Sequence, residues 1–496
     1  MTAQSCTLAQ LLPDVAGVPA IPVPDLALDG RQVVQGGVFV ALAGATRHGL
    51  DFLPQALASG AATVLWEPAP GVAPPSLPPQ VSVLAVPGLR ARLGAMADRV
   101  HGEPSAQLAV TGITGTNGKT TCAWLLAQAL ESLGAHCAYA GTLGWGFPPA
   151  VAAGTHTTPD VLSVHRELAT LVAAGATHAA MEISSHALEQ GRVDGLRIRV
   201  AGFTNLTRDH LDYHGTMERY AEAKRLLFTR PGLECAVINV GDATGADFAA
   251  NLPAATALIA VVLPGASWQG RGRRLALRDA KPVPAGLELD VDGDFGAARV
   301  TVPLVGDFNV ENAAIVLGLL LALGHPLAAA TQALAGATPP PGRMETFASV
   351  TGPLAIVDYA HTPDALAKVL RAARRHCSGR LAVVFGCGGD RDAGKRPLMG
   401  RIASELADDI WLTDDNPRSE DGAAIIRAIA AGLEHPASAH IERDRAAAIA
   451  AAVAAGRAGD VVVIAGKGHE DYQIVGTEVR PFSDREQVRR RLGRAA

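Results

Sequence analysis

The stretch LAVTGITGTNGKTT, residues 108–121, is the part of the chain that predicts its architecture most directly. An apolar run at 108–110 leads into a glycine-rich turn, and a helical pattern follows from Thr120 to Leu133. Strand, loop and helix in this order are the context that a phosphate-binding loop needs. The common loop pattern has a glycine five residues before the glycine of Gly-Lys-Thr, but this chain has Ile113 there. We therefore predict the shorter G-T-N-G-K-T form rather than the loop of a GTPase or motor protein.

The side chains of this loop have the chemistry of nucleotide binding. Gly115 and Gly118 permit a tight turn in which successive backbone N–H groups face phosphate oxygens. Lys119 adds a cation, Thr120 offers a hydroxyl to Mg²⁺, and the start of the helix favours an anion. The alternative is an ordinary strand-to-helix turn that carries a lysine by chance. The predicted ATP contacts of the loop are Gly115, Thr116, Asn117, Gly118, Lys119, Thr120 and Thr121.

The composition indicates a globular protein of several domains. The chain has 496 residues, and an average domain has about 150, so three domains are expected. Hydrophobic residues make up 48% of the chain and charged residues 18%, a balance that favours buried cores over disorder. The net charge of −5 argues against nucleic acid as a partner, because proteins that bind it usually present a basic surface.

Three features predict a cytoplasmic protein without membrane insertion. The six cysteines are scattered without a CxxC pair, a pattern typical of reduced thiols. Residues 1–15 lack the basic segment and apolar core of a signal peptide. The longest apolar run, residues 313–324, is shorter than the roughly 20 residues that span a bilayer. A monomer is expected.

Strand and helix patterns alternate along most of the chain. Residues 1–103 form the first predicted domain, and residues 106–337 form a central P-loop domain with a small antiparallel piece at 272–305. A proline-rich break at 338–342 precedes the third predicted domain, residues 341–496. The predicted fold class is α/β, with a central P-loop parallel-sheet domain between an N-terminal α/β domain and a C-terminal Rossmann-like domain.

Two side chains in the central domain are candidate metal ligands. Glu182 closes one predicted strand and His210 follows another, so both lie at the carboxyl ends of parallel strands, where ligands gather. Carboxylate, hydroxyl and imidazole groups suit a hydrated Mg²⁺ or Mn²⁺. The alternatives are that Glu182 caps the helix after it and that His210 is an ordinary histidine.

Lys224 lies in a predicted amphipathic helix at 216–228. On this segment alone a solvated surface lysine is the simplest interpretation. An ammonium group does not bind a cation, but carbamylation by CO₂ would convert the side chain into a carboxylate-like ligand, N6-carboxylysine.

The chain resembles the Mur ligase family over nearly its whole length. The resemblance is carried by GTNGKTT (115–121), THTTPD (155–160), MEISSHALEQGRV (181–193), TNLTRDHLDYHGTMERYAEAKRLLF (204–228), GDFNVENAAI (306–315), PGRME (341–345), DYAHTPDAL (358–366), DNPRSE (415–420) and AGKGHE (465–470). It implies an ATP-dependent amide ligase of peptidoglycan precursor synthesis, in which ATP converts a substrate carboxylate into an acyl phosphate that an amine attacks. The implied partners are ATP, UDP-N-acetylmuramoyl-L-alanyl-D-glutamate and meso-diaminopimelate.

The resemblance also implies roles for individual residues. Mg²⁺ would be held by Thr120, Glu182, His210 and carbamylated Lys224. Further ATP contacts are expected from Asn309, Arg343, Asp358 and His361. The UDP-muramoyl-dipeptide would contact Leu28, Gly30, Thr157, Thr158, Ser184, Gln190 and Arg192, although some of these are equally explained as helix caps and turns.

The motif Asp415-Asn416-Pro417-Arg418 accompanies meso-diaminopimelate in this family. Arg418 can hold the distal carboxylate of that amino acid through two hydrogen bonds, and lysine has no such group. Arg391, Gly466 and Glu470 match the positions that complete the pocket. An isolated DNPR would indicate only a turn.

The N-terminal domain departs from the family pattern. Serine is usual at position 30 in the uridine-binding segment, and Gly30 supplies no hydroxyl; the residues at 45–47 also differ. Two other functions stay open on the sequence. One is a ligase like folylpolyglutamate synthetase, against which the N-terminal domain and DNPR argue. The other is a nucleotide-dependent switch, in which Glu182, His210 and Lys224 would have no purpose.

Overall fold

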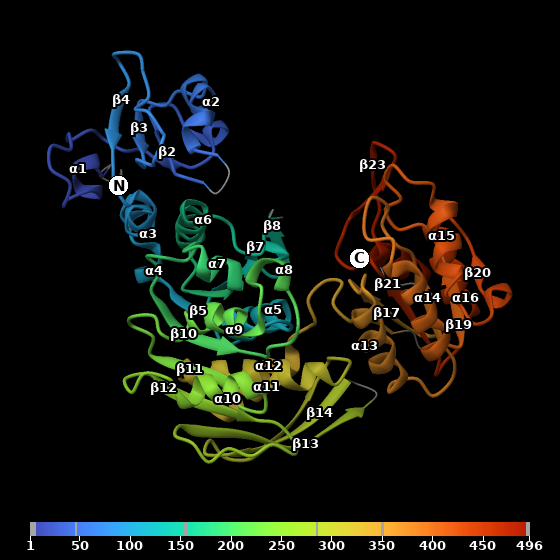
Figure 1. Cartoon of the computed structure of the whole chain (residues 1–496). Helices are drawn as coiled ribbons and strands as arrows, with labels where there is room; N and C mark the ends of the chain where they lie inside the picture. The colour runs from blue at the N-terminus through green and yellow to red at the C-terminus, as the bar shows by residue number, and fades with distance from the viewer. Residues whose placement is uncertain are drawn as a thin grey trace. The chain divides into compact units, whose positions relative to one another are not determined.

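The computed structural model describes residues 6–44, 47–152, 154, 156–283, 286–348 and 352–492. Ala45 and Thr46, part of the predicted departure from the uridine-binding pattern, lie outside the described residues. Contacts divide the chain into two compact units. Figure 1 labels the helices and strands of both. The first unit comprises Met1–Ala123, Leu130–Ala260 and Gln269–Gly272, and the second comprises Trp124–Ala129, Val261–Trp268 and Arg273–Ala496.

The first unit begins with a parallel sheet of four strands in the order β1-β2-β3-β4. Alternate residues of these short strands face opposite layers, as the period of two requires. On one face, Val38 and Val40 of β2 pack with Leu93 of α3, and on the other, Phe39 packs with Ala56 of α2. The elements are α1 (Leu8–Leu11), β1 (Leu26–Ala27), η1 (Gly30–Gln32), β2 (Val38–Ala41), η2 (Gly49–Phe52), α2 (Leu53–Ala58), β3 (Thr63–Trp66), β4 (Ser82–Ala85), α3 (Leu89–Val100) and α4 (Pro104–Gln107).

The same unit contains the strand that precedes the P-loop, β5, at the centre of a second sheet. β5 lies between β10 and β9 and pairs in parallel with both, so the carboxyl ends of the three strands meet at one edge. The elements of this part of the chain are β5 (Ala109–Thr114), α5 (Lys119–Ser132), β6 (Cys137–Gly141), β7 (Gly144–Phe147), β8 (Ala150–Ala152), α6 (Val161–Ala173), β9 (His178–Glu182), α7 (Ser185–Glu189), β10 (Ile198–Phe203), α8 (Leu211–His214), α9 (Met217–Arg225), β11 (Cys235–Asn239), α10 (Ala243–Ala250) and β12 (Ala257–Val262). The middle of α5 and the end of β12 are counted with the second unit.

The second unit starts with the predicted antiparallel piece. β13 pairs antiparallel with β14, and β14 with β15. Helix α11 follows, and its run from 313 to 320 is buried on all sides, which explains its uniformly apolar sequence. The elements are β13 (Arg273–Val283), β14 (Gly286–Gly293), β15 (Ala298–Val302), α11 (Phe308–Ala322) and α12 (Leu327–Gly336).

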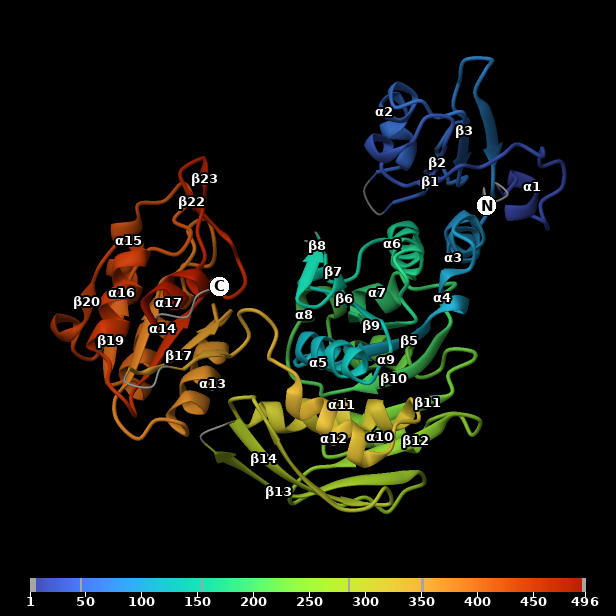
Figure 2. The same cartoon turned by 180° about the vertical axis from the view of Figure 1, so that it is seen from behind.

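The unit ends in a doubly covered sheet with the order β16-β17-β21-β18-β19-β20, parallel except for β16. Ile356 of β17 packs in the layer of α13, α14 and α15, while Ala355 and Val357 pack in the layer of α16 and α17. Figure 2 labels these five helices. The elements are β16 (Glu345–Phe347), β17 (Leu354–Asp358), α13 (Pro363–Arg374), β18 (Leu381–Phe385), α14 (Lys395–Leu406), β19 (Asp409–Leu412), α15 (Gly422–Ala430), η3 (Pro436–Ser438), β20 (His440–Ile441), α16 (Arg445–Ala455), β21 (Val461–Ala465), β22 (Tyr472–Val475), β23 (Glu478–Pro481) and α17 (Asp484–Leu492).

The predicted fold class is confirmed: three parallel-sheet α/β regions follow one another along the chain. The helix predicted at 216–228 is shorter, because α9 ends at Arg225. Within the described residues, no helix combines the length and apolar character that crossing a membrane requires. The predicted boundaries at 103, 106, 337 and 341 remain predictions.

Candidate active site

The loop between β5 and α5 has the backbone geometry of a phosphate-binding loop. Gly115 and Gly118 adopt φ values of +150° and +86°, which residues with side chains rarely adopt. A Cβ atom on Gly115 would lie 1.9 Å from Oγ1 of Thr204, so only glycine fits there. The backbone N–H of Thr116 donates to the carbonyl oxygen of Asn205 over 2.8 Å. The segment after β10 therefore holds the loop in place.

Lys119 folds back over this loop. Its Nζ donates to the carbonyl oxygens of Gly115 and Thr116, both at 2.9 Å. Thr120 and Thr121 follow in the first turn of α5. The ammonium group thus lies on the loop backbone, within reach of an anion that the same loop would bind.

Glu182 is a buried carboxylate beside the P-loop, with an exposed fraction of 1%. The Thr120 hydroxyl donates to its Oε2 over 2.9 Å, and the backbone N–H of Thr142 donates to its Oε1 over 2.9 Å. The Tyr139 hydroxyl also donates to Oε1. A Cβ on Gly141 would lie 2.2 Å from Oε1, so the glycine makes room for the carboxylate. The cap of α7 is Ser184, so the interpretation of Glu182 as a helix cap is wrong.

Lys224 is not a surface residue: it is 1% exposed and points at the P-loop. Its Nζ donates to the carbonyl oxygen of Gly115 over 2.8 Å and lies 4.4 Å from the centre of the Tyr220 ring. Burial, and then the nearby charge of Lys119, hold the pKa of the Lys224 amine well below its ordinary value. A neutral amine is the form that reacts with CO₂, so the environment fits the modification that the sequence could not demonstrate.

His210 lies at the start of α8 in the left-handed backbone region, with φ of +51°. Its side chain is half-exposed. Its ring centre lies 5.0 Å from that of His186 and 6.1 Å from that of Tyr220. Because the Tyr220 hydroxyl and Thr116 Oγ1 are 3.2 Å apart, His210 lies on the side of the P-loop that faces α9.

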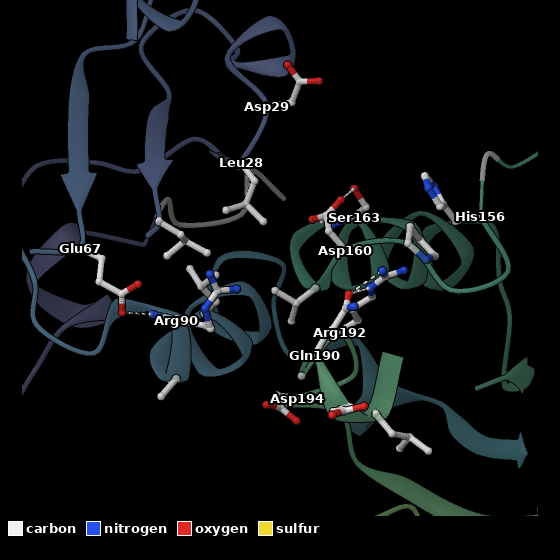
Figure 3. A pocket seen from close by; sticks show the side chains of 18 of the residues that line it. Leu28, Asp29, Glu67, Arg90, His156, Asp160, Ser163, Gln190, Arg192 and Asp194 are labelled. Carbon is white, nitrogen blue, oxygen red and sulfur yellow. Dashed lines mark hydrogen bonds between the residues drawn. The ribbon is translucent and has the colours of Figure 1, made fainter. Parts of the chain in front are cut away.

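A pocket of about 1020 Å³ lies in the first unit, between the N-terminal sheet and helices α6 and α7 (Figure 3). Three predicted substrate contacts line it, namely Leu28, Gln190 and Arg192. Arg192 Nε and Nη2 donate to Gln190 Oε1 over 2.9 and 2.6 Å, and Figure 3 shows the two side chains side by side. Six further lining residues were not named as substrate contacts from the sequence. Four of them belong to no quoted motif, namely Glu67, Arg90, Ser163 and Asp194, whereas His156 and Asp160 lie in the motif at 155–160.

Three predicted contacts have internal partners instead. Thr158 is buried, and its hydroxyl donates to the carbonyl oxygen of Glu182 over 3.0 Å. Ser184 Oγ accepts from the backbone N–H of Ala187 over 3.1 Å as the cap of α7. Thr157 Oγ1 lies 3.0 Å from Thr142 Oγ1. The alternative of a helix cap therefore holds for Ser184, whereas the hydroxyls of Thr157 and Thr158 bond to groups far away in the sequence.

Gly30 is required by packing. A Cβ there would lie 2.9 Å from the backbone nitrogen of Ala56 and 3.0 Å from the carbonyl oxygen of Phe52. The serine that is usual at this position would therefore collide with α2. The missing hydroxyl is explained by the close approach of η1 to this helix.

In the second unit, the predicted nucleotide contacts Arg343, Asp358 and His361 gather around Tyr359. Asp358 Oδ2 accepts from the backbone N–H of Met344 over 2.8 Å, and burial raises the pKa of Asp358. The Arg343 guanidinium carbon lies 4.9 Å from the centre of the Tyr359 ring, and the His361 ring lies 4.7 Å from it. Arg343 Nε is buried without a hydrogen-bond partner among the described residues. Such an orphaned donor fits a ligand group.

Asn309 belongs to the first turn of α11 and is 2% exposed. Its Nδ2 donates to the carbonyl oxygen of Val305 over 2.8 Å, and its Oδ1 accepts from Asn312 over 2.7 Å. Both ends of its amide are therefore bound within the second unit.

The motifs DNPR and KGHE meet in the second unit. Asn416 Nδ2 donates to Glu470 Oε2 over 3.1 Å. A Cβ on Gly466 would lie 2.6 Å from Asp415 Oδ2, so this glycine permits the close approach of the two loops. Pro417 continues the first loop into a turn that Glu420 closes, with its N–H donating to the Pro417 carbonyl over 3.1 Å.

Arg418 has a φ of +52°, and its Nη1 donates to the carbonyl oxygen of Gly389 over 2.9 Å. Gly388 lies next to both arginines of the predicted pocket. A Cβ on it would lie 2.9 Å from Arg418 Nη1 and 3.6 Å from Arg391 Cγ. The structure thus brings together all the motifs predicted to bind the amino acid. Asn416 and Glu470, which are 54 positions apart in the sequence, meet because β18, β19 and β21 are neighbours in one sheet.

Among the residues that the structure describes, no three His, Cys, Asp or Glu side chains form a ready-made cation site. The candidate ligands beside the P-loop combine one carboxylate with a hydroxyl group. The Glu182 carboxylate and the Thr120 hydroxyl are hard oxygen ligands that fit Mg²⁺. Lys224 fits only after conversion of its amine.

Comparison with known proteins finds the same family in all three regions. Family models described as Mur ligase family catalytic domain, Mur ligase middle domain and Mur ligase glutamate ligase domain match residues 23–101, 113–320 and 342–468. A UDP-N-acetylmuramoyl-L-alanyl-D-glutamate–2,6-diaminopimelate ligase of Alkalilimnicola ehrlichii is 49% identical over 98% of each chain. One of Xanthomonas campestris is 48% identical over 97% of this chain and 96% of its own. A solved structure with the same description shares 37% identity and a TM-score of 0.73, covering 99% of both chains.

Proposed function

Because this chain belongs to the Mur ligase family, we propose that it joins meso-diaminopimelate to UDP-N-acetylmuramoyl-L-alanyl-D-glutamate at the expense of ATP. This reaction makes a peptidoglycan precursor in the cytoplasm, and the enzyme acts as a monomer. ATP phosphorylates the substrate carboxylate, the amine attacks the acyl phosphate, and phosphate leaves. The folylpolyglutamate-type alternative lacks support of this kind, since the relatives at 37–49% identity bear the name of the diaminopimelate ligase.

The P-loop supplies the electrostatic part of the phosphoryl transfer. Its backbone N–H groups and Lys119 would bind the terminal phosphates of ATP, because preorganised donors stabilise the charge that develops there. Arg343, with an orphaned buried Nε, and the carboxylate of Asp358 are proposed contacts of the nucleotide. His361 and Asn309 complete the proposed set, although the amide of Asn309 is bound internally.

Thr120, Glu182, His210 and carbamylated Lys224 would hold Mg²⁺, which supplies positive charge opposite the phosphates. Lys224 is already in hydrogen-bond contact with Gly115. A carbamate forms when its neutral amine attacks CO₂ and loses a proton. The low pKa of this amine and its position beside the loop support the assignment.

The UDP-muramoyl-dipeptide would occupy the pocket lined by Leu28, Gln190 and Arg192. The guanidinium of Arg192 suits the carboxylates of the peptide. Gly30 is also a proposed contact of this substrate, through its backbone, because it has no hydroxyl to contribute. Thr157, Thr158 and Ser184 are the remaining proposed contacts of this substrate, and their hydroxyls have partners within the chain in this structure.

The observation that carries the choice of amino acid is the meeting of Arg418, Asn416 and Glu470 in one place. A guanidinium matches the distal carboxylate of meso-diaminopimelate, and a carboxylate matches its distal ammonium. Arg391, Asp415, Pro417 and Gly466 complete the pocket.

An assay of phosphate release tests the proposal. Purified protein with ATP, Mg²⁺ and UDP-N-acetylmuramoyl-L-alanyl-D-glutamate should release phosphate when meso-diaminopimelate is added, and far less with L-lysine. Absence of diaminopimelate-dependent release would refute the proposal. Release that follows L-lysine equally well would refute the pocket alone.

A further inference from the structure

Lys467 is a fully buried lysine that belongs to none of the contacts proposed so far. Its exposed fraction is 0%, and it follows β21 in the loop that also carries Glu470. Its Nζ donates to Asn416 Oδ1 over 3.0 Å and to Glu470 Oε2 over 3.2 Å, and it lies 5.5 Å from the centre of the Tyr472 ring. One buried cation therefore joins the DNPR loop to the KGHE loop.

The contact with Asn416 fixes which way the amide points. Asn416 Oδ1 accepts from Lys467 Nζ and, over 3.0 Å, from the backbone N–H of Ile474. Rotating the amide by 180° would place its NH₂ group against two donors, which leaves all three unsatisfied. Because Oδ1 is held in this way, Nδ2 must face Glu470 Oε2, where it donates over 3.1 Å.

The same cation sets the direction of Glu470. Its Oε2 accepts from both Lys467 and Asn416, while among the described residues no group hydrogen-bonds its Oε1. Its side chain retains 17% exposure, so this second oxygen is accessible to a ligand. The lone pairs of Oε1 are therefore available for an incoming ammonium group.

We propose that Lys467 is a positioning and specificity-determining residue: by bridging Asn416 and Glu470 it aims Glu470 at the distal ammonium of the amino-acid substrate. This inference rests on the proposed function of the pocket. Lys467 does not touch the substrate or the nucleotide. Without it, Asn416 can rotate its amide and Glu470 loses one of its two donors, so the carboxylate is free to turn away.

The test compares Lys467→Met with wild type in the phosphate-release assay. The KM for meso-diaminopimelate should rise at least tenfold, the KM for ATP should change less than twofold, and the preference for diaminopimelate over L-lysine should fall. A residue needed only for folding would move both KM values or neither. Lys368→Met, which removes an exposed lysine paired with Asp364, should leave all three quantities unchanged.

A double substitution shows whether Lys467 acts through Glu470. On a Glu470→Gln background, Lys467→Met should raise the KM for diaminopimelate less than twofold further, because effects through a shared partner are not additive. A full tenfold increase on that background would overturn the inference. If Lys467→Met does not fold, Lys467→Gln, which removes the charge and keeps a donor, carries the same comparison.

Two outcomes distinguish a failure of the proposed function from a failure of this inference alone. Wild-type protein without diaminopimelate-dependent release would overturn the proposed function and this inference together. An active wild type with an unchanged KM for diaminopimelate in the Lys467 variants would overturn the inference alone.

Discussion

Replacing Lys224 by methionine separates a catalytic lysine from a structural one. The side chain is 1% exposed, and its amine makes a hydrogen bond of 2.8 Å to the Gly115 carbonyl. Losing that bond costs roughly 0.5–1.5 kcal/mol of stability. Removing a buried amine recovers a desolvation cost of roughly 1–3 kcal/mol, and methionine fills a similar volume. The two effects oppose each other, so the free energy of unfolding should change by no more than about 2 kcal/mol.

Activity should respond far more strongly than stability. If carbamylated Lys224 holds Mg²⁺ at the phosphates, its loss removes an electrostatic group that acts in the transition state. Such groups contribute about 2.7–4 kcal/mol, which corresponds to a fall in kcat of roughly 10²–10³. Excess bicarbonate should not restore the variant, since it no longer has an amine to modify.

Phosphate release and urea unfolding measure the two quantities on the same preparations. Incubation with ¹³C-bicarbonate should give wild-type protein a carbamate carbon signal by NMR that Lys224→Met lacks. Lys368→Met serves as the control, because Lys368 is half-exposed and forms an ion pair with Asp364 across one helical turn. Unchanged phosphate release by Lys224→Met would refute the reasoning, as would a loss of activity fully accounted for by unfolding.

Three further changes have defined expectations. Arg418→Ala should raise the KM for meso-diaminopimelate at least tenfold with little effect on the KM for ATP, because a charged hydrogen bond contributes about 1.5–3 kcal/mol; equal losses in steady-state kinetics would contradict this. Burial lowers the pKa of His469 from 6.5 to about 4, so the unfolded state binds the proton first as the pH falls, and this group's contribution to the free energy of unfolding is lost between those values. Because one pKa unit corresponds to about 1.4 kcal/mol, the loss between pH 7 and pH 5 is about 2 kcal/mol. Urea unfolding at these two pH values should show a smaller loss of stability for His469→Gln than for wild type; an equal loss would contradict the shift. Gly115→Ala should abolish ATP binding in calorimetry, because its Cβ would lie 1.9 Å from Thr204 Oγ1; normal affinity would show that the loop tolerates the clash.

The sequence correctly predicted the elements that a few neighbouring residues specify. Residues 115–118 form a loop between a strand and a helix, and residues 119–121 begin that helix, because two glycines and an apolar run specify this arrangement within a few residues. The carboxyl end of β9 was the correct place for Glu182, since parallel strands end at one edge whatever surrounds them. The interpretation of Glu182 as a helix cap was wrong because Ser184 occupies that position.

The burial of Lys224 could not be predicted from its own segment. Its helix is polar enough for a surface position, and the segment alone favoured a solvated lysine. Tertiary packing of α9 against the P-loop buries the amine and turns it toward Gly115. Desolvation depends on every neighbour at once, so a pattern along one helix does not contain it.

The sequence by itself determined that this chain is an α/β protein with a phosphate-binding loop, and its motifs identified the ligase family. These properties follow from short-range patterns: glycine positions, apolar periodicity and the order of strands and helices. Only the tertiary structure decided which residues line the pocket beside α6, why Gly30 replaces a serine, and how Lys467 joins Asn416 to Glu470. These outcomes depend on distances between residues far apart in the chain, and those distances exist only once the sheets have assembled.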